Sequence, residues 1–184
     1  VLFGNKKTSL PAIFDRFTWD AGHISVMGKT GSGKTYWTKL NVLRSARFHD
    51  DLEVYIIDPK KRDYQGLVDE LNGETLFVDN LVESDSRVVR YTVKDPSQDN
   101  TKELTEAVKQ VYRNAVKSDG KTLVVIDEAH RIITKGESIH QEGVQAVSSL
   151  IRETRDRNVA ATVVTQNADE FTRSNEGRNI LRNI

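Results

Sequence analysis

Short apolar runs alternate along this chain with longer segments in which apolar residues recur every three or four positions. Near-continuous apolar runs are typical of parallel strands that are buried on both faces. They predict strands over residues 22–27, 53–57, 74–78, 87–93, 121–126 and 159–165. Because predicted helices separate these strands, we expect an α/β fold with a mainly parallel sheet, right-handed crossovers and helices on both faces.

Helical periodicity predicts the elements that cover the sheet. Predicted helices lie over residues 36–48, 63–71, 100–120, 144–154 and 177–183. In the third of these, Asn100 and Glu103 resemble a capping box. Residues 132–141 are polar and contain a glycine, so a loop is expected there. The apolar face of the first helix is expected to consist of Trp37, Leu40, Val42 and Leu43.

The length of 184 residues suits one well-packed domain. The chain begins at Val1 and stops inside a predicted helix, so we expect residues 1–184 to be a single domain of a longer protein. Residues 1–22 predict a short strand or hairpin that leads to the core. No apolar run is long enough to span a bilayer, so membrane contact is expected only through partners. The lack of cysteine is compatible with a cytoplasmic location, including the cytoplasmic face of a membrane complex.

Residues 28–35 match the phosphate-binding pattern G-x-x-x-x-G-K-[ST] between a predicted strand and a predicted helix. Its glycines let backbone N–H groups turn inward at a helix N-terminus, which forms an anion site. Lys34 would reach the β- and γ-phosphates of ATP, and the Thr35 hydroxyl would bind Mg²⁺. The expected nucleotide-binding residues are Gly28, Lys29, Thr30, Gly31, Ser32, Gly33, Lys34 and Thr35.

A second group of polar residues follows the ends of other predicted strands. Asp127 would hold the Mg²⁺ shell from a strand beside the loop, and Glu128 would polarise the attacking water as a general base. Gln166 ends the last strand, and its amide would sense the γ-phosphate if that strand neighbours the loop strand. Asp58 ends its own strand, where it could touch the water network or serve as a turn residue.

No arginine lies inside the loop or directly behind the acidic pair, so the sequence offers no obvious cation in cis for the transferred phosphate. Arg152, Arg155 and Arg157 lie at the end of the helix that precedes the last strand. An exposed arginine there, Arg155 or Arg152, could reach the site of a neighbouring subunit as an arginine finger. The alternative is a solvated face on which Arg152 pairs with Asp156.

The overall charge is balanced, with 27 basic and 27 acidic residues, which excludes a strongly basic nucleic-acid-binding chain. Two tight basic groups remain, at residues 6–7 and 60–62. Either could meet DNA phosphates, but a solvated charged turn is the favoured interpretation. The four histidines lack the spacing of metal ligands, so the pattern does not favour a transition-metal site.

Taken together, these motifs resemble those of the ATPase domain of the HerA/FtsK superfamily, and within it those of the conjugative-transfer ATPases of type IV secretion systems. The similar segments are 4–8, 22–23, 26–35, 58–59, 63–64, 125–130, 151–158, 164–166 and 177–183. The resemblance implies a RecA-like P-loop NTPase fold, with ATP and Mg²⁺ as cofactors. It also implies a homohexameric ring that couples ATP hydrolysis to the movement of DNA or protein, with DNA or secretion-machinery proteins as partners. An arginine near Arg155 would act across the subunit interface.

Two alternatives stay open at this point. One is another motor of the same superfamily, such as a HerA-like DNA translocase or helicase or a viral genome-packaging ATPase. The other is a nucleotide-dependent assembly switch that hydrolyses slowly. Glu128 and the arginines favour a motor, because a switch needs neither a committed base nor a finger from a neighbouring subunit.

Overall fold

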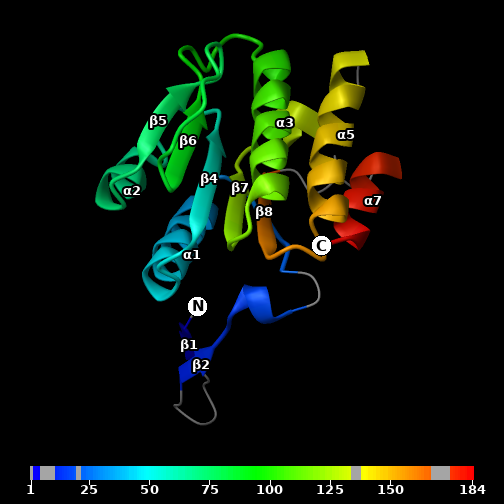
Figure 1. Cartoon of the computed structure of the whole chain (residues 1–184). Coiled ribbons are helices and arrows are strands. Elements are labelled where there is room, and N and C mark those ends of the chain that lie inside the picture. Colours follow the sequence, from blue (N-terminus) through cyan, green and yellow to red (C-terminus); the bar gives the residue numbers. More distant parts are fainter. Residues whose placement is uncertain (1, 5–10, 20–21, 134–137, 167–174) are drawn as a thin grey trace.

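The computed structural model describes residues 2–4, 11–19, 22–133, 138–166 and 175–184. Within these ranges, six parallel strands form one sheet in the order β3-β8-β7-β4-β6-β5 (Figure 1). The strands are β3 (Ile24–Met27), β4 (Glu53–Asp58), β5 (Glu74–Phe77), β6 (Val88–Thr92), β7 (Thr122–Ile126) and β8 (Val159–Thr165). The predicted strands and the α/β class are confirmed, and the described sheet is wholly parallel.

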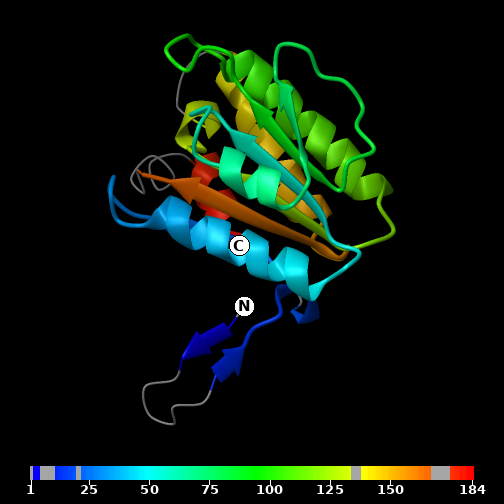
Figure 2. The same ribbon diagram turned by 90° about the vertical axis from the view of Figure 1, so that its left-hand side faces the viewer.

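Helices cover both faces of the sheet (Figures 1 and 2). One face carries α1 (Lys34–Phe48) and α2 (Gln65–Glu70). The other carries α3 (Thr101–Lys117), α5 (Ser138–Glu153) and α7 (Asn175–Arg182), with the short α4 (His130–Ile133) leading toward α5. Among the described residues, no helix is long and apolar enough to cross a membrane.

Alternate residues of the central strands pack into two separate apolar clusters, because successive side chains of a strand point to opposite faces of the sheet. Ile57 and Ile126 pack with the α3 and α5 side chains, whereas Ile56 and Val125 pack with α1 and α2. Strand β7 is buried at every position. Burial on both faces explains why these strands read as continuous apolar runs.

The face of α1 that packs on the sheet is smaller and more polar than predicted. Its buried residues are Thr38, Asn41, Val42, Ser45 and Ala46, so only Val42 of the predicted apolar face is fully buried. Small side chains allow the helix to lie close to the sheet. The hydroxyl of Thr38 donates to the carbonyl of Lys34, which satisfies one polar group at this interface.

Two further local predictions are wrong. Residues 132–141 are not a loop throughout, because α4 extends to Ile133 and α5 begins at Ser138; residues 134–137 lie outside the described part. Ile132 and Ile133 are buried, and burial of this apolar pair favours a helical turn over a solvated loop. Asn100 precedes α3 without forming a capping box, since its side chain makes no cap hydrogen bond. Asp99 accepts the backbone N–H of Thr101 instead.

The N-terminal segment forms an antiparallel hairpin of β1 (Leu2–Gly4) and β2 (Pro11–Ile13), which is separate from the main sheet (Figure 2). The 3-10 turn η1 (Arg16–Thr18) follows it. Arg16 joins this turn to the body of the domain, because its guanidinium donates to Thr162 Oγ1 at 2.7 Å and to the carbonyl of Ala161 at 2.6 Å.

The topology brings the predicted site residues to one edge of the sheet. Met27 of β3 pairs with Thr165 of β8, and Ile57 of β4 pairs with Ile126 of β7. In Figure 2 the end of β8 and the beginning of α1 lie on the same side of the molecule. The residues that follow these strand ends therefore meet at the carboxyl edge, which is the usual ligand-binding edge of an open α/β sheet.

Candidate functional site

The phosphate-binding loop runs from the end of β3 into the first turn of α1. Gly31 and Gly33 have φ values of 78° and 88°, which glycine adopts without the strain that a side chain would add. Lys34 folds back over the loop, and its ammonium donates to the carbonyls of Gly28 at 2.6 Å and Lys29 at 3.0 Å. A cavity of about 580 Å³, lined in part by Trp37, lies beside this loop.

Asp127 follows β7 and is buried. Its Oδ1 accepts the backbone N–H of Glu128 at 2.8 Å, whereas its Oδ2 has no hydrogen-bond partner among the described residues. Burial raises the pKa of Asp127 to about 6. A buried acceptor oxygen without a donor is costly on its own, and a cation or its bound water would satisfy it.

Glu128 is 2% exposed and stands at the bend where the chain leaves β7. Its φ of 46° is uncommon for a residue with a side chain, and such backbone strain clusters at functional sites. The bend lies between two sheet-like hydrogen bonds, because Asp127 donates its N–H to Ile57 and Ala129 donates its N–H to Val164. The conformation of Glu128 is therefore fixed from both neighbouring strands.

Three side chains surround the Glu128 carboxylate. The amide of Gln166 and the ammonium of Lys60 both approach Oε1, and His130 Nδ1 lies 3.1 Å from Oε2. Burial alone would raise the pKa of Glu128, but the hydrogen bonds from Lys60 and Gln166 outweigh it and lower this pKa. The carboxylate is thus held in its charged form at a buried position.

Gln166 connects this carboxylate to the phosphate-binding loop. Its Oε1 accepts the hydroxyl of Thr30 at 2.5 Å, while its Nε2 donates to Glu128. This connection exists because β8 is the neighbour of the loop strand β3, as the sequence argument required. The acidic pair follows β7, however, which is separated from β3 by β8, so the expectation that its strand lies beside the loop is wrong.

Lys60 is placed by the turn that follows β4. Asp58 accepts the backbone N–H of Lys60 at 3.0 Å, and the buried guanidinium of Arg90 on β6 lies 2.9 Å from Asp58 Oδ2. Arg90 also donates to the carbonyl of Lys61 and, at 2.5 Å, to Gln65 Oε1. One buried arginine therefore anchors both Asp58 and the turn that carries Lys60.

Residues 18–168 match the family model described as AAA domain. The chain belongs to the AAA domain family. This AAA domain binds nucleotide through its P-loop and is an ATPase of the P-loop NTPase fold. No curated protein sequence matches the chain.

Two solved structures share the fold of this AAA domain. VirB4 of Thermoanaerobacter pseudethanolicus matches with a TM-score of 0.74 and 16% identity, over 100% of this chain and 82% of that one. The pCW3 conjugation coupling protein TcpA, in a monomer form with ATPγS, matches with a TM-score of 0.61 and 14% identity. That match covers 97% of this chain and 51% of TcpA. Both similarities agree with the fold that the motif resemblance implied.

The AAA domain contains functional candidates that sequence reasoning missed. Lys60 is more than a solvated charge, because its ammonium pairs with the buried Glu128, whereas Lys61 and Arg62 of the same turn are exposed. Asp58 acts as a turn residue, because it accepts the N–H of Lys60, and it also pairs with Arg90. One signal was available: Arg90 interrupts a buried apolar run, and a charged residue in a buried strand needs a partner.

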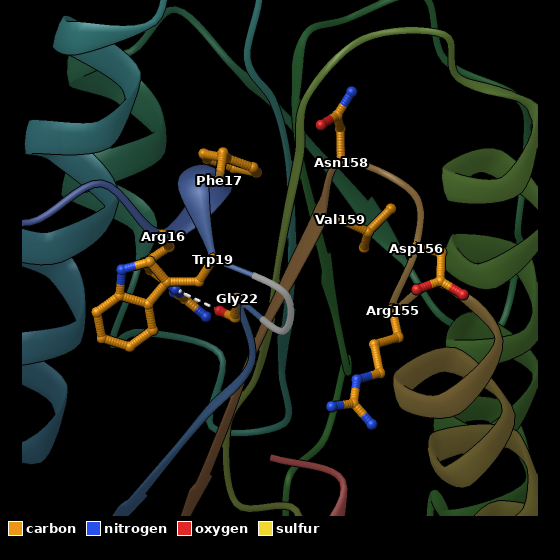
Figure 3. Close-up of a pocket in the computed structure, with 8 residues that line it drawn as sticks. All are labelled: Arg16, Phe17, Trp19, Gly22, Arg155, Asp156, Asn158 and Val159. Atoms are coloured by element: carbon orange, nitrogen blue, oxygen red, sulfur yellow. Dashed lines mark hydrogen bonds between the residues drawn. The ribbon is translucent and has the colours of Figure 1, made fainter.

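The arginines at the end of α5 lie elsewhere in the AAA domain. Arg155 and Arg152 are exposed near the start of β8, whereas Gln166 follows its end. Figure 3 shows Arg155 beside a cavity of about 550 Å³ that Trp19 also lines. Arg152 lies 3.5 Å from Glu153 on an exposed surface, so the expected pairing with Asp156 is replaced by this contact.

Proposed function

We propose that this AAA domain is the Mg²⁺-dependent ATPase motor of a conjugation or type IV secretion machine, in which ATP hydrolysis drives the movement of DNA or protein. The observation that carries the catalytic part is the chain of contacts from Thr30 through Gln166 to Glu128. It links the loop that binds phosphate to a buried carboxylate. Such a link is what a hydrolytic site needs in order to couple nucleotide occupancy to its base.

In this proposal, the glycine-rich loop and Lys34 bind the β- and γ-phosphates, and Lys34 exchanges its contacts with the Gly28 and Lys29 carbonyls for phosphate oxygens. Glu128 accepts a proton from the attacking water. Gln166 senses the γ-phosphate and, through its hydrogen bond to Glu128, couples the presence of this phosphate to the base. The water oxygen bonds to the γ-phosphorus as the bond to the bridging oxygen of ADP breaks, and the bonding electrons leave with ADP.

The residues present fit a Mg²⁺ ion. Asp127 offers a buried Oδ2 without a hydrogen-bond partner in the described part of the chain, and hard oxygen donors suit this cation. Thr35, in the first turn of α1, would supply the hydroxyl ligand. When bound, Mg²⁺ would neutralise charge on the nucleotide phosphates.

The partners follow from the same proposal. We place the domain in a homohexameric ring at the cytoplasmic face of a membrane complex, with DNA or secretion-machinery proteins as substrates. The fold similarity to VirB4 and to the coupling protein TcpA supports this setting. The exposed position of Arg155, away from its own phosphate-binding loop, is compatible with action on a neighbouring subunit.

The test is ATP turnover and nucleotide binding in matched variants, with and without added DNA. Lys34→Ala is expected to lose binding and turnover, whereas Glu128→Gln is expected to keep binding and lose turnover. Glu83→Gln, on an exposed residue, is the control for the loss of one glutamate charge. Stimulation by DNA would support a DNA translocase, and its absence would favour a secretion or assembly role. Undiminished hydrolysis by Glu128→Gln would contradict the assignment of the base.

A further inference from the structure

A lysine and a histidine flank the carboxylate that the proposed function uses as its base. The ammonium of Lys60 pairs with Glu128 Oε1, the same oxygen that accepts the amide of Gln166. Glu128 Oε2 is buried, with His130 Nδ1 at 3.1 Å, so neither oxygen of the carboxylate is open to a water molecule. In this arrangement Lys60 and Gln166 hold the Glu128 carboxylate, which is therefore not yet available to accept a proton from water.

The two partners differ in how freely they can move. Glu128 is 2% exposed and is fixed by its strained backbone, whereas the Lys60 side chain is 35% exposed. Lysine is a compact charge on a flexible four-carbon stem, so it can exchange one anion for another without moving the backbone. If the contact is broken, Lys60 is the partner that moves.

The backbone that carries Lys60 is fixed independently of Glu128. Asp58 accepts its N–H group, and Arg90 anchors Asp58 and the carbonyl of Lys61. Only two hydrogen-bonded side chains, Glu128 and Gln166, separate Lys60 from Thr30 of the phosphate-binding loop. The stem of Lys60 thus starts from a rigid turn at the rim of the nucleotide site.

We propose that Lys60 is a sensor of the terminal phosphate of a nucleoside triphosphate, and that it controls the availability of Glu128. Without a γ-phosphate, Lys60 holds the Glu128 carboxylate. With ATP bound, the ammonium transfers to the γ-phosphate oxygens, and Glu128 is released to accept the proton of the attacking water. Lys60 stays protonated throughout and loses no proton to the reaction. This inference rests on the proposed role of Glu128 as the base.

The proposal also supplies a positive charge in cis. No arginine lies inside the phosphate-binding loop or directly behind the acidic pair in the sequence, which was the reason to expect a cation from a neighbouring subunit. Lys60 removes this reason, because a cation of the same chain already lies at the acidic pair. A ring can still form, but the lack of a positive charge near the transferred phosphate is no longer a reason to infer one.

The experiment measures the dissociation constants of ADP and of ATPγS, which do not depend on turnover. Wild-type protein is expected to bind ATPγS more tightly than ADP. Lys60→Met should lose about tenfold of this preference, the value of one charge-assisted hydrogen bond, with little change for ADP. Lys60→Arg should retain most of it. Arg62→Met, which removes an exposed cation from the same turn, is the control.

A double-mutant cycle separates a sensor from a structural clamp. Glu128→Gln should bind ATPγS more tightly than wild-type protein, because Lys60 no longer has to leave a carboxylate. This gain should vanish in the Lys60→Met, Glu128→Gln double variant. If Lys60→Met lowers turnover but leaves the ATPγS-to-ADP ratio unchanged, Lys60 only positions Glu128 and the sensor is refuted. Turnover by Glu128→Gln would refute the proposed function instead, and the binding cycle would still decide the role of Lys60.

Discussion

Arg90 on β6 and Asp58 on β4 form an ion pair, with a separation of 2.9 Å, in which both side chains are buried. The two strands are direct neighbours, so the pair spans adjacent strands of the sheet, and the buried Thr92 hydroxyl contacts Arg90 and the carbonyl of Asp58. Moving two charges out of water is expensive, and their attraction compensates only if further hydrogen bonds complete the geometry. Here Lys60, Lys61 and Gln65 complete it, and the pair therefore shapes the turn at the nucleotide site.

Removing one partner of this pair should destabilise the domain strongly. Asp58→Ala leaves the Arg90 guanidinium buried without its counter-charge, which costs about 3–5 kcal/mol in comparable cases. Urea unfolding of wild type and variant measures the difference in the free energy of unfolding. Arg47→Ala breaks the exposed pair with Glu70 and is the control, with an expected loss below about 1 kcal/mol. Equal losses of unfolding free energy in the two variants would show that the buried pair contributes no more to stability than the exposed pair.

Gln166 should affect turnover more than nucleotide binding. Gln166→Ala removes both the donor to Glu128 and the acceptor of the Thr30 hydroxyl, so the base loses its connection to the loop. We expect kcat to fall roughly tenfold or more while the affinity for ATPγS changes little. Gln145→Ala, on the exposed side of α5, is the matched control. A large loss of affinity with unchanged kcat would assign Gln166 to binding instead.

His23 should make the domain sensitive to acid. Burial, with the charges of Arg16 and Arg155 as smaller contributions, lowers the pKa of His23 to about 4, and its Nδ1 accepts the N–H of Ala161. The unfolded chain binds the proton near pH 6.5, so the stability due to neutral His23 is present above pH 6.5 and is lost as the pH falls toward 4. A shift of this size corresponds to about 3 kcal/mol. His23→Asn, which keeps an acceptor, should lose less stability between pH 6.5 and pH 4 than wild type.

The comparison of the two stability curves is the readout for His23, because carboxylates elsewhere also respond to acid. Thermal or urea unfolding at several pH values between 4 and 8 gives both curves. The difference between the two proteins should change through this window and stay constant above pH 7. Parallel curves over the whole range would contradict the role of His23.

The sequence was sufficient to predict those features that depend on the residues of a single chain segment. Continuous apolar runs locate the parallel strands because these strands are buried on both faces. The P-loop is a local motif, so the strand, glycines and helix that form it are predictable together. The position of Gln166 near the loop also followed, since it needed only the assumption that β8 neighbours β3.

The sequence was insufficient where contacts depend on which strands are neighbours. Lys60 meets Glu128 because β4 lies beside β7, and Arg90 meets Asp58 because β6 lies on the other side of β4. These residues are 68 and 32 positions apart, from 128 − 60 and 90 − 58, and no local pattern links them.

Arg155 and Gln166 lie beyond opposite ends of β8. Strand β8 contains seven residues between Arg155 and Gln166, and an extended strand of this length spans about 20 Å. An arginine side chain cannot cover that distance, so Arg155 cannot act on the γ-phosphate bound by its own chain. If Arg155 contributes to hydrolysis as a finger, it must do so in a neighbouring subunit. The specific activity, which is the turnover per amount of protein, should then rise with protein concentration as the ring assembles.

Mixing two inactive variants tests this directly. Arg155→Ala lacks the finger but keeps Glu128, whereas Glu128→Gln lacks the base but keeps Arg155. In a mixed ring, a Glu128→Gln subunit would offer its arginine to the intact site of an Arg155→Ala neighbour, so activity should return. A mixture of Lys34→Ala and Glu128→Gln should stay inactive, because both changes disable the nucleotide site of their own chain. Arg152→Ala tests the other candidate arginine on the same exposed surface. Full activity of Arg155→Ala alone, or activity strictly proportional to protein concentration down to concentrations at which the protein is monomeric, would argue against a finger at this position.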